Sequence, residues 1–140
     1  MIHARKPVQT LLLVTEDRAL AAYIDGILER ALGMRTKPAG SFAEAAALLA
    51  EGGFAAVLAD VPRGTSPKMR DFTAAAAVPV LIVADEEDRA AARRAVEDGA
   101  VLYMIREGLT PDTLVGAVLE VLERSGPPQG PMGGSGSVPG

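Results

Sequence analysis

Short apolar segments alternate along this chain with longer segments in which apolar residues recur every three or four positions. The continuously apolar segments predict β-strands at residues 10–15, 54–59, 79–84 and 101–105. A weaker strand, MRTK at 34–37, is expected at an edge of the sheet. Because the other strands are apolar on both faces, the pattern indicates a parallel sheet that is covered by helices on each side.

The first longer segment carries a helical pattern. Apolar side chains in residues 17–32 recur at the spacing of a single helix face, and Gly33 is expected to end the helix as its C-cap. The apolar positions on this face are Leu20, Tyr23, Ile24, Ile27, Leu28 and Ala31. We therefore expect this helix to bury one side against the sheet.

Two later helices begin at sequence signals for N-caps. Ser41 and Glu44 have the spacing of a capping box, and the helix that they start is expected to run to Glu51. Thr110 and Pro111 fit the N-cap and first position of a last helix, which is expected to reach about residue 124. Its predicted buried face consists of Leu114, Val118, Leu119 and Leu122.

Further helices are predicted near residues 67–76 and over 85–99. The alternation of strands and helices predicts a single doubly wound (βα)5 domain of the α/β class over residues 9–124. The rest of the chain, residues 125–140, is rich in glycine, proline and serine and is predicted to be a flexible tail or linker.

Composition excludes several classes of function. The 140 residues include no cysteine and one histidine, His3, which argues against disulfides, thiolate metal sites and histidine-based catalysis. The formal charge is −4 without a basic cluster, so we expect no direct binding of nucleic acid. No apolar run approaches the ~20 residues of a membrane span, and residues 1–10 lack the apolar stretch of a signal peptide. A cytoplasmic protein is expected.

Charged side chains follow four of the predicted strands. Glu16 and Asp17 follow the first strand, Asp60 the third, Asp85 the fourth and Arg106 the fifth. Since the carboxyl ends of parallel strands meet at one edge of a sheet, we expect these groups to converge in one crevice.

Four segments, LLLVTEDRAL, FAAVLADVPRG, PVLIVADEED and GAVLYMIREG, resemble in order and spacing the receiver domain of bacterial response regulators in two-component signalling. The resemblance covers about residues 9–124. It implies a flavodoxin-like, five-stranded parallel sheet of order 2-1-3-4-5. It also implies that Asp60 accepts a phosphoryl group from a histidine kinase in a phosphorelay, which would make the chain a phosphoprotein.

The resemblance further implies a Mg²⁺ site. The family supplies an acidic pair after the first strand, the acceptor aspartate and a backbone carbonyl two residues later. Here the expected ligands are Glu16, Asp60 and the carbonyl of Pro62, while Thr15 stands where the family has a second acid. Asp17 is one place too late for that acid and is expected to cap the first helix instead.

Three positions that contact the phosphoryl group or switch in the family are altered or isolated. Ala84 replaces a hydroxyl residue, Arg106 replaces a lysine, and Tyr103 matches the aromatic switch position without its hydroxyl partner. Arg106 has two interpretations, contact with a phosphoryl group or an ion pair with Asp60 or Glu107. Each lost charge-assisted hydrogen bond is worth ~1–2 kcal/mol, so several losses would leave a phosphorylated state poorly stabilised.

Two hypotheses about function follow from the resemblance. The favoured one is an atypical receiver that regulates by protein–protein interaction, with weak or absent phosphorylation and no enzymatic activity. Its partner would be a histidine kinase or another signalling protein, or a second copy docked through the 86–124 face. The alternative is a working Mg²⁺-dependent phospho-acceptor switch at Asp60. A small-ligand binder ranks last, because the acidic VTEDRAL segment does not suit a phosphate loop.

Simpler structural roles remain open for each site residue. Asp60 is also suited to an Asx turn after a strand, and Glu16 to a solvated loop. Tyr103 is equally compatible with plain half-buried packing.

Overall fold

The structure, a computed structural model, describes residues 9–61, 67–97 and 99–124. In these ranges the chain forms one five-stranded sheet in which every neighbouring pair is parallel and the order is β2-β1-β3-β4-β5. The strands are β1 (Thr10–Val14), β2 (Arg35–Ala39), β3 (Ala56–Val61), β4 (Val80–Ala84) and β5 (Leu102–Ile105). The predicted fold and strand order are confirmed, and the weak strand β2 lies at an edge.

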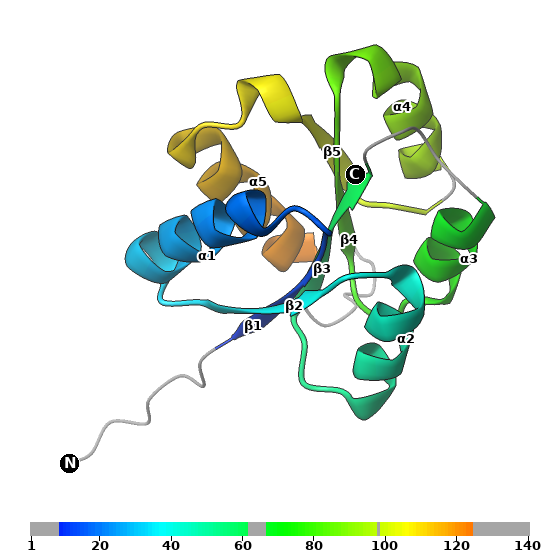
Figure 1. The fold of residues 1–140 in the computed structure, drawn as a ribbon, viewed down its shortest axis with the longest axis horizontal. Helices are drawn as coiled ribbons and strands as arrows, with labels where there is room; N and C mark the ends of the chain where they lie inside the picture. The colour runs from blue at the N-terminus through cyan, green and yellow to red at the C-terminus, as the bar shows by residue number, and fades with distance from the viewer. Residues whose placement is uncertain (1–8, 62–66, 98, 125–140) are drawn as a thin grey trace, which may run out of the picture.

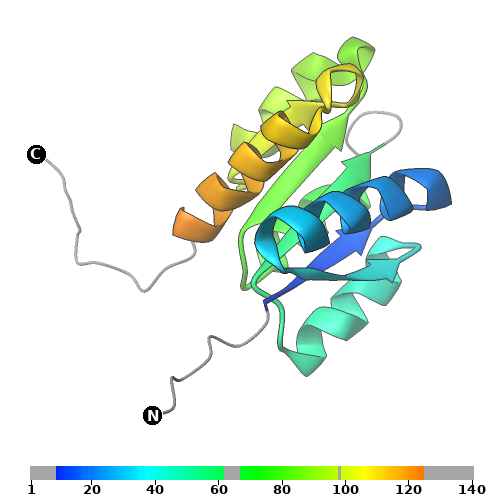
Figure 2. The same cartoon turned by 90° about the vertical axis from the view of Figure 1, so that its left-hand side faces the viewer.

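Helices cover both faces of the sheet (Figures 1 and 2). The first face carries α1 (Arg18–Leu32) and α5 (Pro111–Arg124), which lie side by side. The opposite face carries α2 (Phe42–Glu51), α3 (Pro67–Ala75) and α4 (Arg89–Glu97). Two short 3-10 turns, η1 (Glu86–Asp88) and η2 (Arg106–Gly108), follow β4 and β5. None of the helices in the described ranges is both long and apolar enough to span a membrane.

The alternation of side chains along the strands divides the core into two layers. Leu11 and Leu13 face α1 and α5, whereas Leu12 and Val14 face the helices of the opposite side. Burying one such leucine contributes about 1.5–3 kcal/mol relative to leaving it exposed. The apolar strands are therefore held from both sides, which fixes the rim where their carboxyl ends meet.

The predicted helix caps are present. Asp17 caps α1 by accepting the N–H of Leu20 (3.0 Å), and Gly33 ends it with φ 65°, a left-handed conformation that favours glycine. Ser41 caps α2 by accepting the N–H of Glu44 (3.0 Å). The second half of the capping box differs from expectation, because the Glu44 carboxylate accepts the N–H of Gly40 (2.8 Å).

Three sequence predictions need correction. The helix predicted over 85–99 begins instead as the 3-10 turn η1, and α4 proper has nine residues. The strand predicted to end at residue 59 continues through Asp60 and Val61, which pair with Val83 and Ala84 of β4. The predicted tail 125–140 is not among these corrections, because it lies outside the described residues.

The third correction concerns the helix faces. Leu119 is 44% exposed, and Val121 takes its place in the core beside Leu114 and Val118. The buried stripe therefore follows positions i, i+4 and i+7, and Leu119 is rotated by one residue, about 100°, out of it. On α1, Tyr23 is 42% exposed and Ala31 is also exposed.

Candidate functional site

Asp60 lies at the carboxyl end of β3, in the wall of a cleft of about 660 Å³. The residue is only 8% exposed, and its backbone belongs to the ladder with β4. The charged and polar residues that line the cleft include Glu16, Asp17, Ser41, Asp60, Asp85 and Arg106. The expected convergence of four strand ends at one rim is therefore observed.

Thr15, the residue after β1, binds Asp60 directly. Its hydroxyl donates to Asp60 Oδ2 (2.8 Å) and accepts the backbone N–H of Asp17 (3.0 Å). The second contact orients the hydroxyl, because the oxygen accepts from one side and donates on the other. This contact was not predicted, because Thr15 was interpreted only as a missing acid, although a hydroxyl at the same sheet rim as a carboxylate is a signal for it.

Arg106 occupies the other oxygen of Asp60. Its Nη2 donates to Asp60 Oδ1, and its Nε donates to Asp85 Oδ1 (2.7 Å). Partial burial lowers the pKa of Arg106, but the hydrogen bonds to the two aspartates outweigh this effect and raise the pKa above its ordinary value. The guanidinium is therefore permanently charged and links the ends of β3, β4 and β5.

A second contact joins the segments that follow β4 and β5. The Glu107 carboxylate, next to Arg106 in η2, accepts the backbone N–H of Glu86 in η1 (3.0 Å). This contact occupies one of the free N–H groups at the start of the α4 segment. Ala84, the last residue of β4, is 1% exposed and brings only a methyl group to this place. The connection between β4 and α4 is thus held by Arg106 and Glu107 rather than by a hydroxyl at residue 84.

Tyr103 faces away from this network. It is half-buried, packs with the core layer on the α2–α3–α4 side, and does not line the cleft. Its hydroxyl lies beside Arg93 and Arg89 of α4, and hydrogen bonds from these two guanidiniums lower the pKa of Tyr103. Arg89 also pairs with Glu86 (2.7 Å). The observed environment is therefore that of a tyrosine tied to α4.

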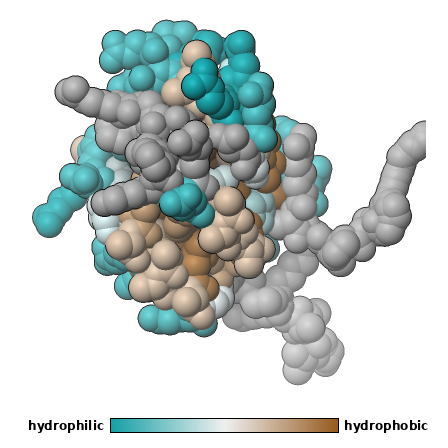
Figure 3. Space-filling view, turned by 90° about the vertical axis from the view of Figure 1, so that its right-hand side faces the viewer, coloured by the Kyte–Doolittle hydropathy of each residue, from teal (hydrophilic) through white to brown (hydrophobic). Residues whose placement is uncertain are grey.

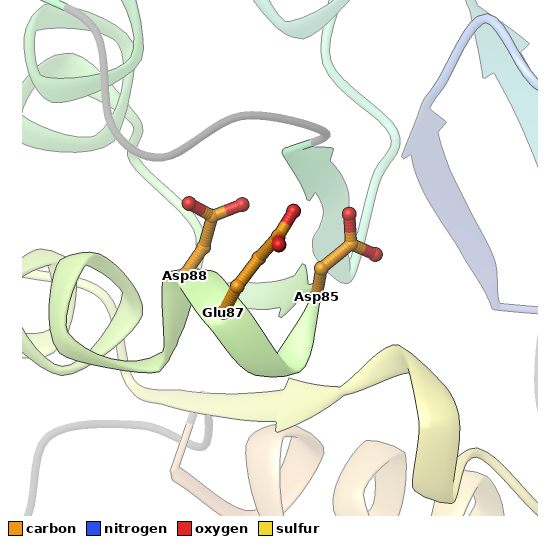
Figure 4. Close-up of side chains that lie close together, drawn as sticks. All are labelled: Asp85, Glu87 and Asp88. Carbon is orange, nitrogen blue, oxygen red and sulfur yellow. The ribbon is translucent and has the colours of Figure 1, made fainter.

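Three acidic side chains crowd the rim next to the cleft. Asp85, Glu87 and Asp88 extend from the same side of η1, with carboxylate oxygens within 4.8 Å of one another (Figure 4). Asp85 Oδ1 accepts a hydrogen bond from Arg106 Nε. The cluster makes the rim more negative, and Arg106 offsets part of that charge.

The residues around Asp60 do not fit a magnesium ion as they are arranged. Each oxygen of Asp60 already has a partner within the chain, and one partner is a cation. Glu16 is exposed and lines the cleft, whereas Pro62, the third expected ligand, lies outside the described residues. A hard divalent cation needs several free oxygen ligands, and at Asp60 it would compete with the Arg106 guanidinium for the same carboxylate.

Comparison with known proteins supports the fold. No protein-family model and no curated protein matches the sequence. Among solved structures, NtrX from Brucella abortus is 19% identical with a TM-score of 0.73, over 85% of this chain and 28% of NtrX. Chemotaxis response regulator CheY4 of Vibrio cholerae is 21% identical with a TM-score of 0.69, over 83% of this chain and all of CheY4 (100%).

A putative response regulator from Chloroflexus aurantiacus is 24% identical with a TM-score of 0.72, over 84% of this chain and 100% of that one. The chain therefore has the fold of response-regulator receiver domains. It corresponds to less than a third of NtrX, so the likeness does not extend to the rest of that protein.

Proposed function

We propose that this chain is a cytoplasmic receiver-type signalling domain that regulates other proteins by docking to them, with weak or absent phosphorylation of Asp60. The observation that carries the proposal is the occupation of Asp60 from within the chain. Thr15 takes Oδ2 and Arg106 takes Oδ1, so the groups that would meet an incoming phosphoryl group are already engaged.

Phosphorylation of an aspartate requires a free carboxylate oxygen to attack phosphorus while the bond to the donor's leaving group breaks. In this chain each oxygen of Asp60 already accepts a hydrogen bond, which stabilises the free carboxylate and would be weakened by the transfer. A hydrogen bond to a charged group contributes about 1.5–3 kcal/mol, and this cost would add to the barrier of the transfer. The transfer is therefore disfavoured before any contact with a donor is considered.

The proposed docking surface is the 86–124 face, which includes α4, β5 and α5. Arg106 and Glu107 connect the Asp60 site to the start of this face through Asp85 and the N–H of Glu86. We propose that these contacts hold the face in one arrangement without a phosphoryl group. A histidine kinase, another signalling protein or a second copy of the chain is the proposed partner, and no catalytic activity is proposed for the chain itself.

A labelling experiment tests this function. The chain is incubated with acetyl phosphate and millimolar Mg²⁺, quenched in acid and measured by intact mass. We expect no stable phosphoryl adduct on the wild type and none on Asp60→Asn. In Arg106→Lys, one oxygen of Asp60 loses its forked partner, and we expect labelling to increase. Arg94→Lys, at an exposed position of α4, is the matched control.

Mg²⁺-dependent labelling of the wild type that disappears in Asp60→Asn would contradict the proposal. It would support the alternative, a functional aspartyl phospho-acceptor switch. That alternative has one favourable observation, because Glu16 and Asp60 line the same cleft.

A further inference from the structure

An apolar groove lies between α2 and α3, on the side of the sheet opposite to α1 and α5. Its volume is about 620 Å³, and its walls include Phe42, Ala46, Leu49, Phe72, Ala75 and Ala76. Figure 3 shows light-brown and brown side chains gathered over this part of the surface. A concave apolar surface of this kind can bind an apolar side of another molecule.

The groove contains a packed pair of aromatic rings and has small wall residues. The rings of Phe42 and Phe72 pack against each other with centroids 5.3 Å apart at 47°. The exposed residues of α2 that line the groove after Ser41 are alanines, Ala43, Ala46 and Ala50, whereas Ala47 is exposed outside it. Small wall residues let another helix approach the two backbones closely.

The groove lies next to the acidic cleft. Ser41 and Phe42 line both, so the N-terminus of α2 separates the apolar surface from the carboxylates around Asp60. The described residues that line the groove and the cleft include five carboxylates and one guanidinium, and that guanidinium is bound to Asp60 and Asp85. The charge that remains at this end favours a cationic partner.

We propose that the α2–α3 groove is a docking site for an amphipathic helix of a partner protein, with basic residues that point toward the cleft. The wall from Phe42 to Ala50 rises over about 12 Å, at about 1.5 Å per residue, so it spans about two turns of a docked helix. Two or three apolar side chains at helical spacing would fill it. This site lies outside the 86–124 face.

The test uses a fluorescent peptide of leucine and lysine, about 14 residues long, whose leucines form one helical stripe. Ala46→Arg places a long side chain in the groove, whereas Ala47→Arg adds the same charge to the same helix outside it. We expect the peptide to bind the wild type, to bind Ala46→Arg at least about tenfold more weakly, and to bind Ala47→Arg within about twofold of the wild type.

A second pair of variants tests the charge. Glu16→Gln, at the cleft, is expected to weaken binding of the lysine peptide by more than Glu29→Gln, which is exposed on α1 and lines neither cavity. Thermal unfolding of each variant checks the fold. If Ala46→Arg unfolds, Ala75→Arg in the wall of α3 and Ala74→Arg outside it replace the first pair.

Three results would overturn the proposal. One is equal effects of Ala46→Arg and Ala47→Arg, and another is equal binding of a peptide with glutamate in place of lysine. The third is dimerisation of the wild type that Ala46→Arg abolishes and Ala47→Arg preserves, because the occupant would then be a second copy. None of these results bears on the labelling of Asp60, so this proposal and the proposed function fail separately.

Discussion

Arg106 carries out a task that a lysine side chain cannot perform in the same way. Two different nitrogens of one planar guanidinium, Nη2 and Nε, donate to the carboxylates of Asp60 and Asp85. A lysine ammonium is a flexible point charge and has no fixed fork that sets the angle between two acceptors. The replacement therefore fixes the relative position of the ends of β3 and β4 as well as neutralising charge.

Loss of the guanidinium is expected to destabilise the fold. In Arg106→Met the buried Asp60 carboxylate keeps only the Thr15 hydroxyl, and we expect the free energy of unfolding to fall by about 2–3 kcal/mol. Adding Asp60→Asn removes the uncompensated charge and should recover part of the loss, so the two changes should be coupled by at least about 1 kcal/mol. Urea denaturation of the single and double variants measures this coupling.

Arg94→Met, at an exposed site in the last turn of α4, is the control and should change stability by no more than about 0.5 kcal/mol. An Arg106→Met variant as stable as this control would show that the pair with Asp60 contributes nothing to folding. The role given to Arg106 in the proposed function would then lose its basis.

Single residues of the site could be predicted from the sequence only in part. The position of Asp60 and its nearness to Arg106 followed from the rule that parallel strands gather their carboxyl ends at one rim. Whether Arg106 pairs with Asp60 or is left to contact a phosphoryl group did not follow from the sequence, because it depends on side-chain directions. The contact between Thr15 and Asp60 was not predicted, because the family pattern shows only that position 15 lacks an acid and not that its hydroxyl becomes a donor.

Local sequence signals predict several helix ends, but they do not predict where α4 begins. The caps at Asp17, Ser41 and Gly33 act within four residues of themselves, so the sequence alone could predict them. The start of α4 could not be predicted this way. Asp85 and Glu86, which precede α4, are bound by Arg106 and Glu107, 21 residues further along the chain, and helical periodicity carries no information about such contacts.

Asp17 lines the acidic cleft, yet its side chain caps α1. We expect Asp17→Ala to lower the free energy of unfolding by about 1 kcal/mol and Asp17→Ser to lower it by only a few tenths, because serine also accepts the N–H of the third helical residue. Chemical denaturation of both variants distinguishes a cap from a charge. Equal losses in the two variants would show that the negative charge, and not the cap, is what matters.

At the scale of the whole molecule, periodicity predicted five strands and the alternation of elements predicted a doubly wound sheet. The strand order was not contained in either pattern, because crossovers of similar length permit more than one order. It came from the resemblance to receiver domains, and the register of the five strands confirms it. The two core layers explain why this order is stable, since each layer is closed by its own set of helices.

The division into a folded domain and a tail remains a prediction and is open to a direct test. A chain that ends at residue 124 is expected to unfold at the same temperature as the full chain, within about 1 °C. A chain that ends at Ala117 loses the buried Val118 and Val121 and is expected to be less stable by several kcal/mol. Calorimetry of both truncated chains measures these effects. A marked fall in melting temperature on removal of 125–140 alone would contradict the division into domain and tail.

The edge strand β2 has a consequence for how copies of this molecule can meet. Pro38, which has no N–H to donate, sits in this strand together with the exposed charged residues Arg35 and Lys37. Such an edge resists the addition of another strand. Two copies that associate are therefore not expected to join β2 to β2 into a continuous ten-stranded array, and at high concentration this side of the molecule should protect against fibril growth.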